Sequence, residues 1–187
     1  MPVLSHVEPT PNPNAFKFHS GEMLVERGTL SFQNATAAEK LPVAQALFEL
    51  GNIDAVLIAE DFVSVSGTRA ANWAKIRQTV EEHLPNFDKD AAQALADQQA
   101  AASAEARSSQ SGNELFKKVE EIIDMYVRPA LAGDGGGVEL VGIDEKTVHI
   151  RYQGACGSCP TSTASTLSAI ENLLHDKVDP ELRLVPA

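Results

Sequence analysis

Alternating apolar and polar residues predict several strands in the first half of the chain. Two phenylalanines face the same way within residues 15–19, as on a half-buried strand. Apolar runs at residues 53–59 and 62–66 are separated by a short acidic turn and predict a pair of strands. A further strand is expected at residues 23–26. The pattern therefore favours a sheet in this half of the chain.

Helical spacing of apolar residues predicts two helices beside these strands. Residues 42–50 begin with Pro42, which suits a first helical turn, and are followed by Gly51, which suits the end of a helix. Apolar residues also recur at helical intervals across residues 68–84, and we expect this amphipathic helix to pack Trp73 on the sheet. No combination of residues in this half predicts catalysis.

The composition changes at residues 86–112, which are rich in Ala, Gln, Asp and Ser. The alanines favour a helix, but the segment lacks an apolar stripe, so we expect it to bury little. We interpret it as a flexible or transiently helical linker. The fold class predicted is α+β, with two small α+β domains at residues 1–85 and 113–187 joined by this Ala/Gln/Ser-rich linker.

The second domain shows a simpler order of elements. Helical spacing predicts helices at residues 114–127 and 161–174, and alternation predicts strands at residues 137–143 and 147–153. Only three residues separate the two strands, and so short a connection permits only an antiparallel hairpin. The glycines that precede the hairpin predict a tight turn, because the patterns of phosphate-binding loops are absent.

Charge and composition exclude several classes of protein. The 187 residues carry a formal net charge of -11 without a cluster of Lys or Arg, so nucleic-acid binding is not expected. No apolar run reaches membrane-spanning length, and the first residues resemble neither a signal peptide nor an Arg-rich transit segment. We expect a bacterial cytoplasmic protein. The alternative is a mature form in the mitochondrial matrix.

The candidate chemistry lies at Cys156 and Cys159, which are the only two cysteines of the chain and form a C-x-x-C pair. The pair falls between a predicted strand and a predicted helix. Unpartnered backbone N–H groups and the helix dipole stabilise a thiolate at a helix N-terminus. The position of the pair therefore favours charged sulfur ligands or nucleophiles.

Three chemistries use two thiolates at this spacing: dithiol exchange, half of a zinc site and half of an iron-sulfur site. None of the five histidines lies at ligand spacing from a cysteine or from another histidine, so the sequence contains no second half-site. A bound metal would need ligands from elsewhere, and the simplest source is Cys156 and Cys159 of a second copy. A thioredoxin-like dithiol redox protein and a structural zinc-binding module are the alternatives.

Two features of the surroundings favour a cluster over dithiol exchange. Thioredoxin-like folds place the motif in a βαβ unit, whereas the strand that contributes this motif is predicted to follow its neighbour in a hairpin. Pro160 follows the second cysteine, an order shared with bacterial ferredoxin loops.

Two sets of residues resemble a known family. The set around the cysteines comprises Arg128-Pro129, Asp134-Gly135-Gly136 and Gly154-Ala155-Cys156-Gly157-Ser158-Cys159-Pro160. It resembles the NifU-like C-terminal domain of Nfu-type iron-sulfur proteins over most of residues 113–187. The other set comprises Thr10-Pro11-Asn12-Pro13-Asn14, Phe16-Lys17-Phe18, Leu47-Phe48, Asp61-Phe62-Val63-Ser64-Val65 and Trp73. It resembles the Nfu N-terminal domain.

The resemblance implies a non-enzymatic scaffold or carrier for iron-sulfur clusters. Its holo form would be a homodimer that holds one 4Fe-4S cluster between Cys156 and Cys159 of both subunits. The partners implied are the cluster assembly machinery and apo iron-sulfur acceptor proteins. The chain departs from the family pattern at Gly137, where an acidic residue is usual, and at Thr161, where Ser is commoner. We expect the N-terminal domain to bind acceptors on its tether without touching the metal.

Overall fold

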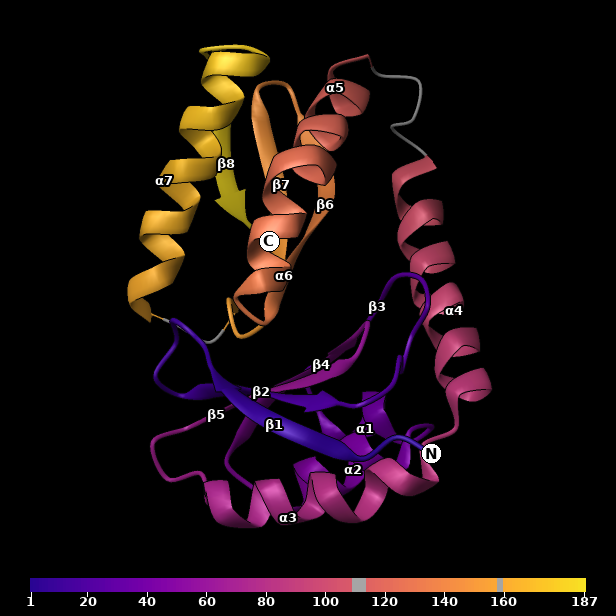
Figure 1. Ribbon diagram of the computed structural model, residues 1–187. Helices are drawn as coiled ribbons and strands as arrows, with labels where there is room; N and C mark the ends of the chain where they lie inside the picture. Colours follow the sequence, from indigo (N-terminus) through magenta and orange to yellow (C-terminus); the bar gives the residue numbers. More distant parts are fainter. Residues whose placement is uncertain (109–113, 158–159) are drawn as a thin grey trace.

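The computed structural model describes residues 1–108, 114–157 and 160–187, and it shows the predicted α+β class (Figure 1). A five-stranded sheet has the order β1-β2-β5-β4-β3, and a three-stranded sheet has the order β6-β7-β8. Helices α1 to α3 lie on one side of the larger sheet, and the smaller sheet with its helices lies on the other side (Figure 1). Among the described helices, none is long and apolar enough to cross a membrane.

All neighbouring strands of the larger sheet are antiparallel. Its strands are β1 (Leu4–Pro9), β2 (Ala15–Ser20), β3 (Thr29–Phe32), β4 (Ile53–Ala59) and β5 (Phe62–Gly67). The strands predicted at residues 15–19, 53–59 and 62–66 are confirmed. Strands β1 and β3 were not predicted.

The prediction of a strand at residues 23–26 is wrong. Leu24 and Val25 are buried in a loop, and their backbone N–H groups donate to the carbonyl of Glu60 at 2.6 and 3.1 Å. Two consecutive apolar residues favour a strand in the sequence. A loop that crosses a core buries apolar side chains in the same way, so the pattern does not distinguish the two. Leu30 and Phe32 of β3 complete this part of the core.

The helices of this half cover one face of the sheet. They are α1 (Ala35–Ala38), α2 (Pro42–Glu49), α3 (Trp73–His83) and the 3-10 turn η1 (Leu84–Asn86). Helix α3 begins later than predicted because the Asn72 side chain accepts from the N–H of Lys75 at 3.2 Å and caps it there. The ring of Trp73 meets that of Phe16 of β2 edge-on, with 4.7 Å between centroids.

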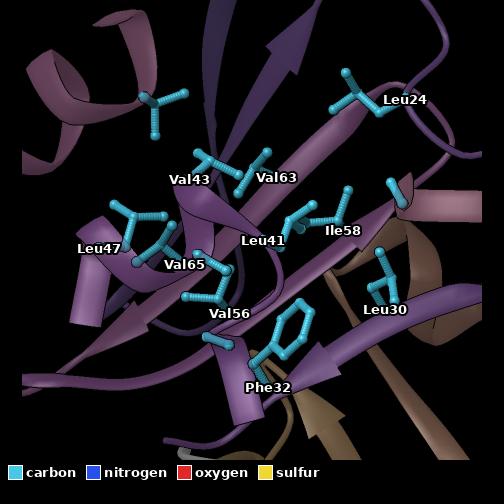
Figure 2. Close-up of a cluster of buried hydrophobic side chains, with 14 of the residues drawn as sticks. Leu24, Leu30, Phe32, Leu41, Val43, Leu47, Val56, Ile58, Val63 and Val65 are labelled. Carbon is cyan, nitrogen blue, oxygen red and sulfur yellow. The ribbon is translucent and has the colours of Figure 1, made fainter. Parts of the chain in front are cut away.

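The main apolar core lies between the sheet and these helices. Figure 2 shows aliphatic side chains of β4, β5 and α2 directed toward one another, with Phe32 at one side. Because alternate residues of β4 and β5 enter this core, their other side chains face the opposite surface of the sheet. There Leu57, Ala59 and Phe62 form a separate small buried cluster.

The segment expected to be a flexible linker contains helix α4 (Lys89–Ser108). Ala92 and Ala96 of α4 are buried in the main core, so the segment packs on the first domain instead of burying little. The pattern of apolar residues could not reveal this contact, because alanines make close approach possible without a stripe of large side chains. The domain limits at residues 85 and 113 remain a prediction.

Two glutamines strengthen the docking of α4. The Gln93 side-chain amide donates to the carbonyl of Arg27 at 3.0 Å, and its oxygen accepts from two neighbouring backbone N–H groups. The Gln99 side-chain oxygen accepts from the N–H of Ser31 at 3.1 Å. These bonds satisfy backbone groups of β3 and the loop before it.

The second half combines a hairpin with two helical segments. Its elements are α5 (Glu114–Ile122), the π-helical turn η2 (Ile123–Val127), α6 (Arg128–Gly133), β6 (Gly136–Asp144), β7 (Thr147–Gly154), α7 (Pro160–Lys177) and β8 (Arg183–Pro186). The predicted hairpin is confirmed, because β6 and β7 pair antiparallel. The predicted helix at residues 114–127 continues through η2 and α6. Strand β8 returns parallel to β7 after α7.

Candidate functional site

The first cysteine lies in the turn that leads from β7 toward α7. The N–H of Gly157 donates to the carbonyl of Gly154 at 3.2 Å and closes this turn. Cys156 is 9% exposed and packs in the core of the second half. Helix α7 begins at Pro160, close after the motif, as predicted. Cys159, the other predicted ligand, lies outside the described residues.

The glycine turn before β6 packs directly on the cysteine turn. Gly135 has a φ of +74°, and its carbonyl accepts from the N–H of Ala155 at 3.2 Å. A Cβ added to Gly136 would overlap Sγ of Cys156. The predicted tight turn is confirmed, but its second role was not predicted. Glycine at position 136 leaves the space that the sulfur occupies.

Tyr152 places a buried hydroxyl in the surroundings of Cys156. The residue is 7% exposed, and its hydroxyl has no hydrogen-bond partner among the described residues. Burial, and secondarily the charge of Cys156, raise the pKa of Tyr152 to about 12. The hydroxyl therefore stays protonated and can donate a hydrogen bond to an anionic group. An unpartnered buried donor costs about 1–3 kcal/mol, which a bound anion would recover.

The first half of the chain contacts the cysteine turn. The side-chain amide of Asn12 donates to the carbonyl of Ala155 at 3.0 Å. Lys17, which is buried, donates to the carbonyl of Gly133 at 2.7 Å, and Leu57 lies against Gly154. The first half of the chain therefore lies against the turn that carries Cys156, and its expected role of binding acceptors without touching the metal stays a prediction. The contacting residues are far from the motif in sequence, so no local signal revealed them.

No histidine among the described residues forms a group of possible metal ligands with Cys156. Among the described residues, the only group of three possible metal ligands comprises His6, Glu8 and His19, and it does not include Cys156. His149 is half-buried on β7, on the strand face opposite its buried neighbours. The described part of the chain thus gathers no His or carboxylate set around Cys156 to complete a metal site.

The strand topology around the motif removes one reason for preferring a cluster over dithiol exchange. The hairpin of β6 and β7 is present, but β7, α7 and β8 also form a unit with parallel strands, and the cysteine turn opens its crossover. A hairpin before the motif does not exclude a βαβ unit after it. The topology therefore does not separate a cluster site from dithiol exchange.

Comparison with protein families covers both halves of the chain. A model described as NifU-like domain matches residues 119–185. A model described as scaffold protein Nfu/NifU N terminal matches residues 5–91.

Similar proteins are found among curated sequences and solved structures. NifU-like protein 4, mitochondrial, of Arabidopsis thaliana is 30% identical over 167 residues, which are 88% of this chain and 59% of that protein. The NFU1 iron-sulfur cluster scaffold homolog, mitochondrial, of Drosophila erecta is 30% identical over 89% of this chain and 58% of that protein. The chain thus spans about three fifths of the length of these relatives. A solution structure of a NifU-like protein from Saccharomyces cerevisiae covers 44% of this chain and 77% of its own, with 27% identity and a TM-score of 0.39.

The two model matches account for both domains. The relatives align over 88% and 89% of the present chain. The chain therefore belongs to the Nfu family of NifU-like proteins.

Proposed function

We propose that this protein is a scaffold or carrier that holds a 4Fe-4S cluster between Cys156 and Cys159 of two subunits and passes it to apo-proteins. The observation that carries the proposal is the placement of Cys156 in a tight turn just before α7, inside the NifU-like domain. The names of the relatives support iron-sulfur scaffolding as the broader role. The cluster is cargo, so the protein is proposed to act by binding and release and not as an enzyme.

The charge of the cargo fits the surroundings of the turn. Four thiolates outweigh the positive charge of a 4Fe-4S core, so the bound unit is an anion that needs hydrogen-bond donors. The buried hydroxyl of Tyr152 is such a donor. Gly136 contributes by leaving space beside Sγ of Cys156.

Release follows from the distribution of ligands. A site with two cysteines from each subunit lets the thiols of an acceptor replace one pair at a time. A pocket with four cysteines in one chain would resist such exchange. We therefore propose a homodimer in the holo form, with cluster assembly proteins as donors and apo iron-sulfur proteins as acceptors.

The proposed location follows the relatives. The Arabidopsis and Drosophila proteins are both named as mitochondrial, which favours the mitochondrial matrix over the bacterial cytoplasm for this chain. The bacterial cytoplasm remains the prediction from the sequence alone.

Reconstitution and transfer test the proposed function. Purified protein is incubated anaerobically with iron and sulfide, and the visible spectrum, iron content and transfer to an apo iron-sulfur protein are measured. Cys156→Ser and Cys159→Ser should each abolish stable cluster binding, because each removes two of four ligands from the dimer. Ser168→Ala, at an exposed position of α7, is the matched control and should leave binding unchanged. A stable cluster in Cys156→Ser protein would show that another ligand set exists.

The same preparation tests the alternatives. A dithiol redox protein would reduce insulin disulfides without iron, and we expect no such activity. Zinc in aerobically purified protein is less informative, because thiolate pairs take up zinc readily. Zinc that resists displacement during cluster assembly would favour a structural zinc site.

A further inference from the structure

Three possible metal ligands meet on the β1 and β2 pair, outside the cysteine turn. His6 and Glu8 lie two residues apart on β1, so they share a face, and His19 pairs with His6 across the strands. One ligand atom from each side chain lies within 4.8 Å of the other two. We propose that His6, Glu8 and His19 bind one first-row divalent cation. This inference is independent of the proposed cluster function.

The donor set suits such a cation. Zinc accepts imidazole nitrogen and carboxylate oxygen, and sites with two histidines and one carboxylate leave a further position for water. The same donors suit other divalent metals of the first row, whose relative affinities follow a common order. Zn²⁺ is therefore an appropriate probe.

Hydrogen bonds already orient both imidazoles for this role. Nδ1 of His19 lies 3.5 Å from a carboxylate oxygen of Asp61, while Nε2 points to Glu8 at 2.9 Å. Nδ1 of His6 lies 3.0 Å from the hydroxyl of Ser5. Metal-binding histidines usually hold an oxygen partner with their second nitrogen, which fixes the tautomer and the ring orientation. Nδ1 of each ring here has such an oxygen neighbour, and Nε2 of His19 would exchange its contact with Glu8 for the metal.

Binding requires one imidazole ring to turn. The two rings are stacked, with 4.4 Å between centroids and 3° between planes, so in this arrangement their nitrogens do not point at a common cation. His6 is exposed, so its ring can turn toward a shared cation. Glu8 also accepts from Nζ of Lys17 at 3.0 Å, and a carboxylate can keep that bond through one oxygen while the other binds a metal.

A metal at this position would join an edge strand to the sheet. Strand β1 has β2 as its one neighbour, and the three ligands come from both strands. A cation bound in this way stabilises the folded protein, because the unfolded chain does not bring the ligands together. Zn²⁺ should therefore raise the midpoint of thermal unfolding.

Calorimetric titration with Zn²⁺ tests the site. The full chain carrying Cys156→Ser and Cys159→Ser is used, so that thiolates do not compete. We expect about one Zn²⁺ per chain. His6→Gln should remove this binding, and Asp61→Asn should weaken it by about 10–100-fold, because the charged carboxylate beside Nδ1 of His19 is lost. His83→Gln and Asp54→Asn are the matched controls and should leave the affinity unchanged.

The Zn²⁺ affinities of the parent and of His6→Gln decide whether the site exists. Because His6 is exposed, His6→Gln should keep the circular dichroism spectrum of the parent, so its loss of Zn²⁺ binding reports the site and not the fold. Equal Zn²⁺ affinity in the parent and in His6→Gln would overturn the proposal. So would an absence of Zn²⁺ binding, or of a thermal shift, in the folded parent.

Discussion

At the scale of single residues, Tyr152 links the fold to the proposed cargo. Its hydroxyl is buried near Cys156 and lacks a partner among the described residues. Burial raises the pKa of the Tyr152 phenol to about 12, so it remains a donor at neutral pH. The side chain thus costs stability in the apo form and is available to an anion in the loaded form.

Replacing this tyrosine separates the two effects. Tyr152→Phe should leave the apo protein as stable as before or more stable by up to about 1–3 kcal/mol, because an unsatisfied hydroxyl is removed. The reconstituted cluster should decay several-fold faster, because a donor is lost. Thermal unfolding and the decay of cluster absorbance measure these results. Tyr126→Phe, on an exposed tyrosine, is the control, and equal cluster lifetimes in the two variants would contradict the role of Tyr152.

At the scale of elements, the glycine turn before β6 shapes the cysteine turn. Gly136→Ala should reduce cluster assembly and destabilise the fold by about 1–3 kcal/mol, because the added Cβ overlaps Sγ of Cys156. Gly133→Ala is a close control, since a Cβ there meets nothing within 4 Å. Urea unfolding and reconstitution yield provide the measurements. Equal behaviour of the two variants would show that the turn tolerates the methyl group.

The elements also show how far the sequence predicts the fold. Strands β2, β6 and β7 and helices α2 and α7 follow their apolar patterns, because one face of each is buried. Strands β4 and β5 are continuous apolar runs because both of their faces are buried. The short strand β3 and the loop at Leu24 could not be distinguished by their apolar patterns, because the side chains of a brief apolar run are buried equally well in a strand or in a loop. Helix α4 docks through Ala92 and Ala96, whose small side chains give no periodic signal.

The candidate site was predictable only in part. Cysteine count and spacing predict Cys156 and Cys159 as ligands, which stays a prediction, while the helix start close after them is confirmed. The neighbours of Cys156 could not be predicted in the same way, because Asn12 and Leu57 reach the turn through tertiary contacts across more than half the chain. A lone buried tyrosine in an alternating strand likewise gives no sign that its hydroxyl lacks a partner.

At the scale of the whole molecule, residues of the first half contact the turn that carries Cys156. Leu57 lies in a cluster on the sheet face opposite the main core and packs against Gly154. The amide of Asn12 is bonded to Ala155, the residue before Cys156. We therefore expect movement of the first half to change access to the sulfur of Cys156.

A thiol-labelling experiment tests this coupling. Leu57→Ser in a Cys159→Ser background should increase the alkylation rate of Cys156 several-fold, because the contact with Gly154 is weakened while the main core is left intact. Leu50→Ser, at an exposed position after α2, serves as the control. Unchanged labelling in Leu57→Ser protein would show that the first half does not restrict the turn.

The mass and iron content of the reconstituted protein test the central claim most directly. If two subunits share the ligands, native mass spectrometry should find the cluster in dimers, with about one 4Fe-4S per two chains, and the apo protein mainly as monomer. Dilution of the holo protein should release cluster and monomer together. A monomer that retains a complete 4Fe-4S cluster would contradict the account.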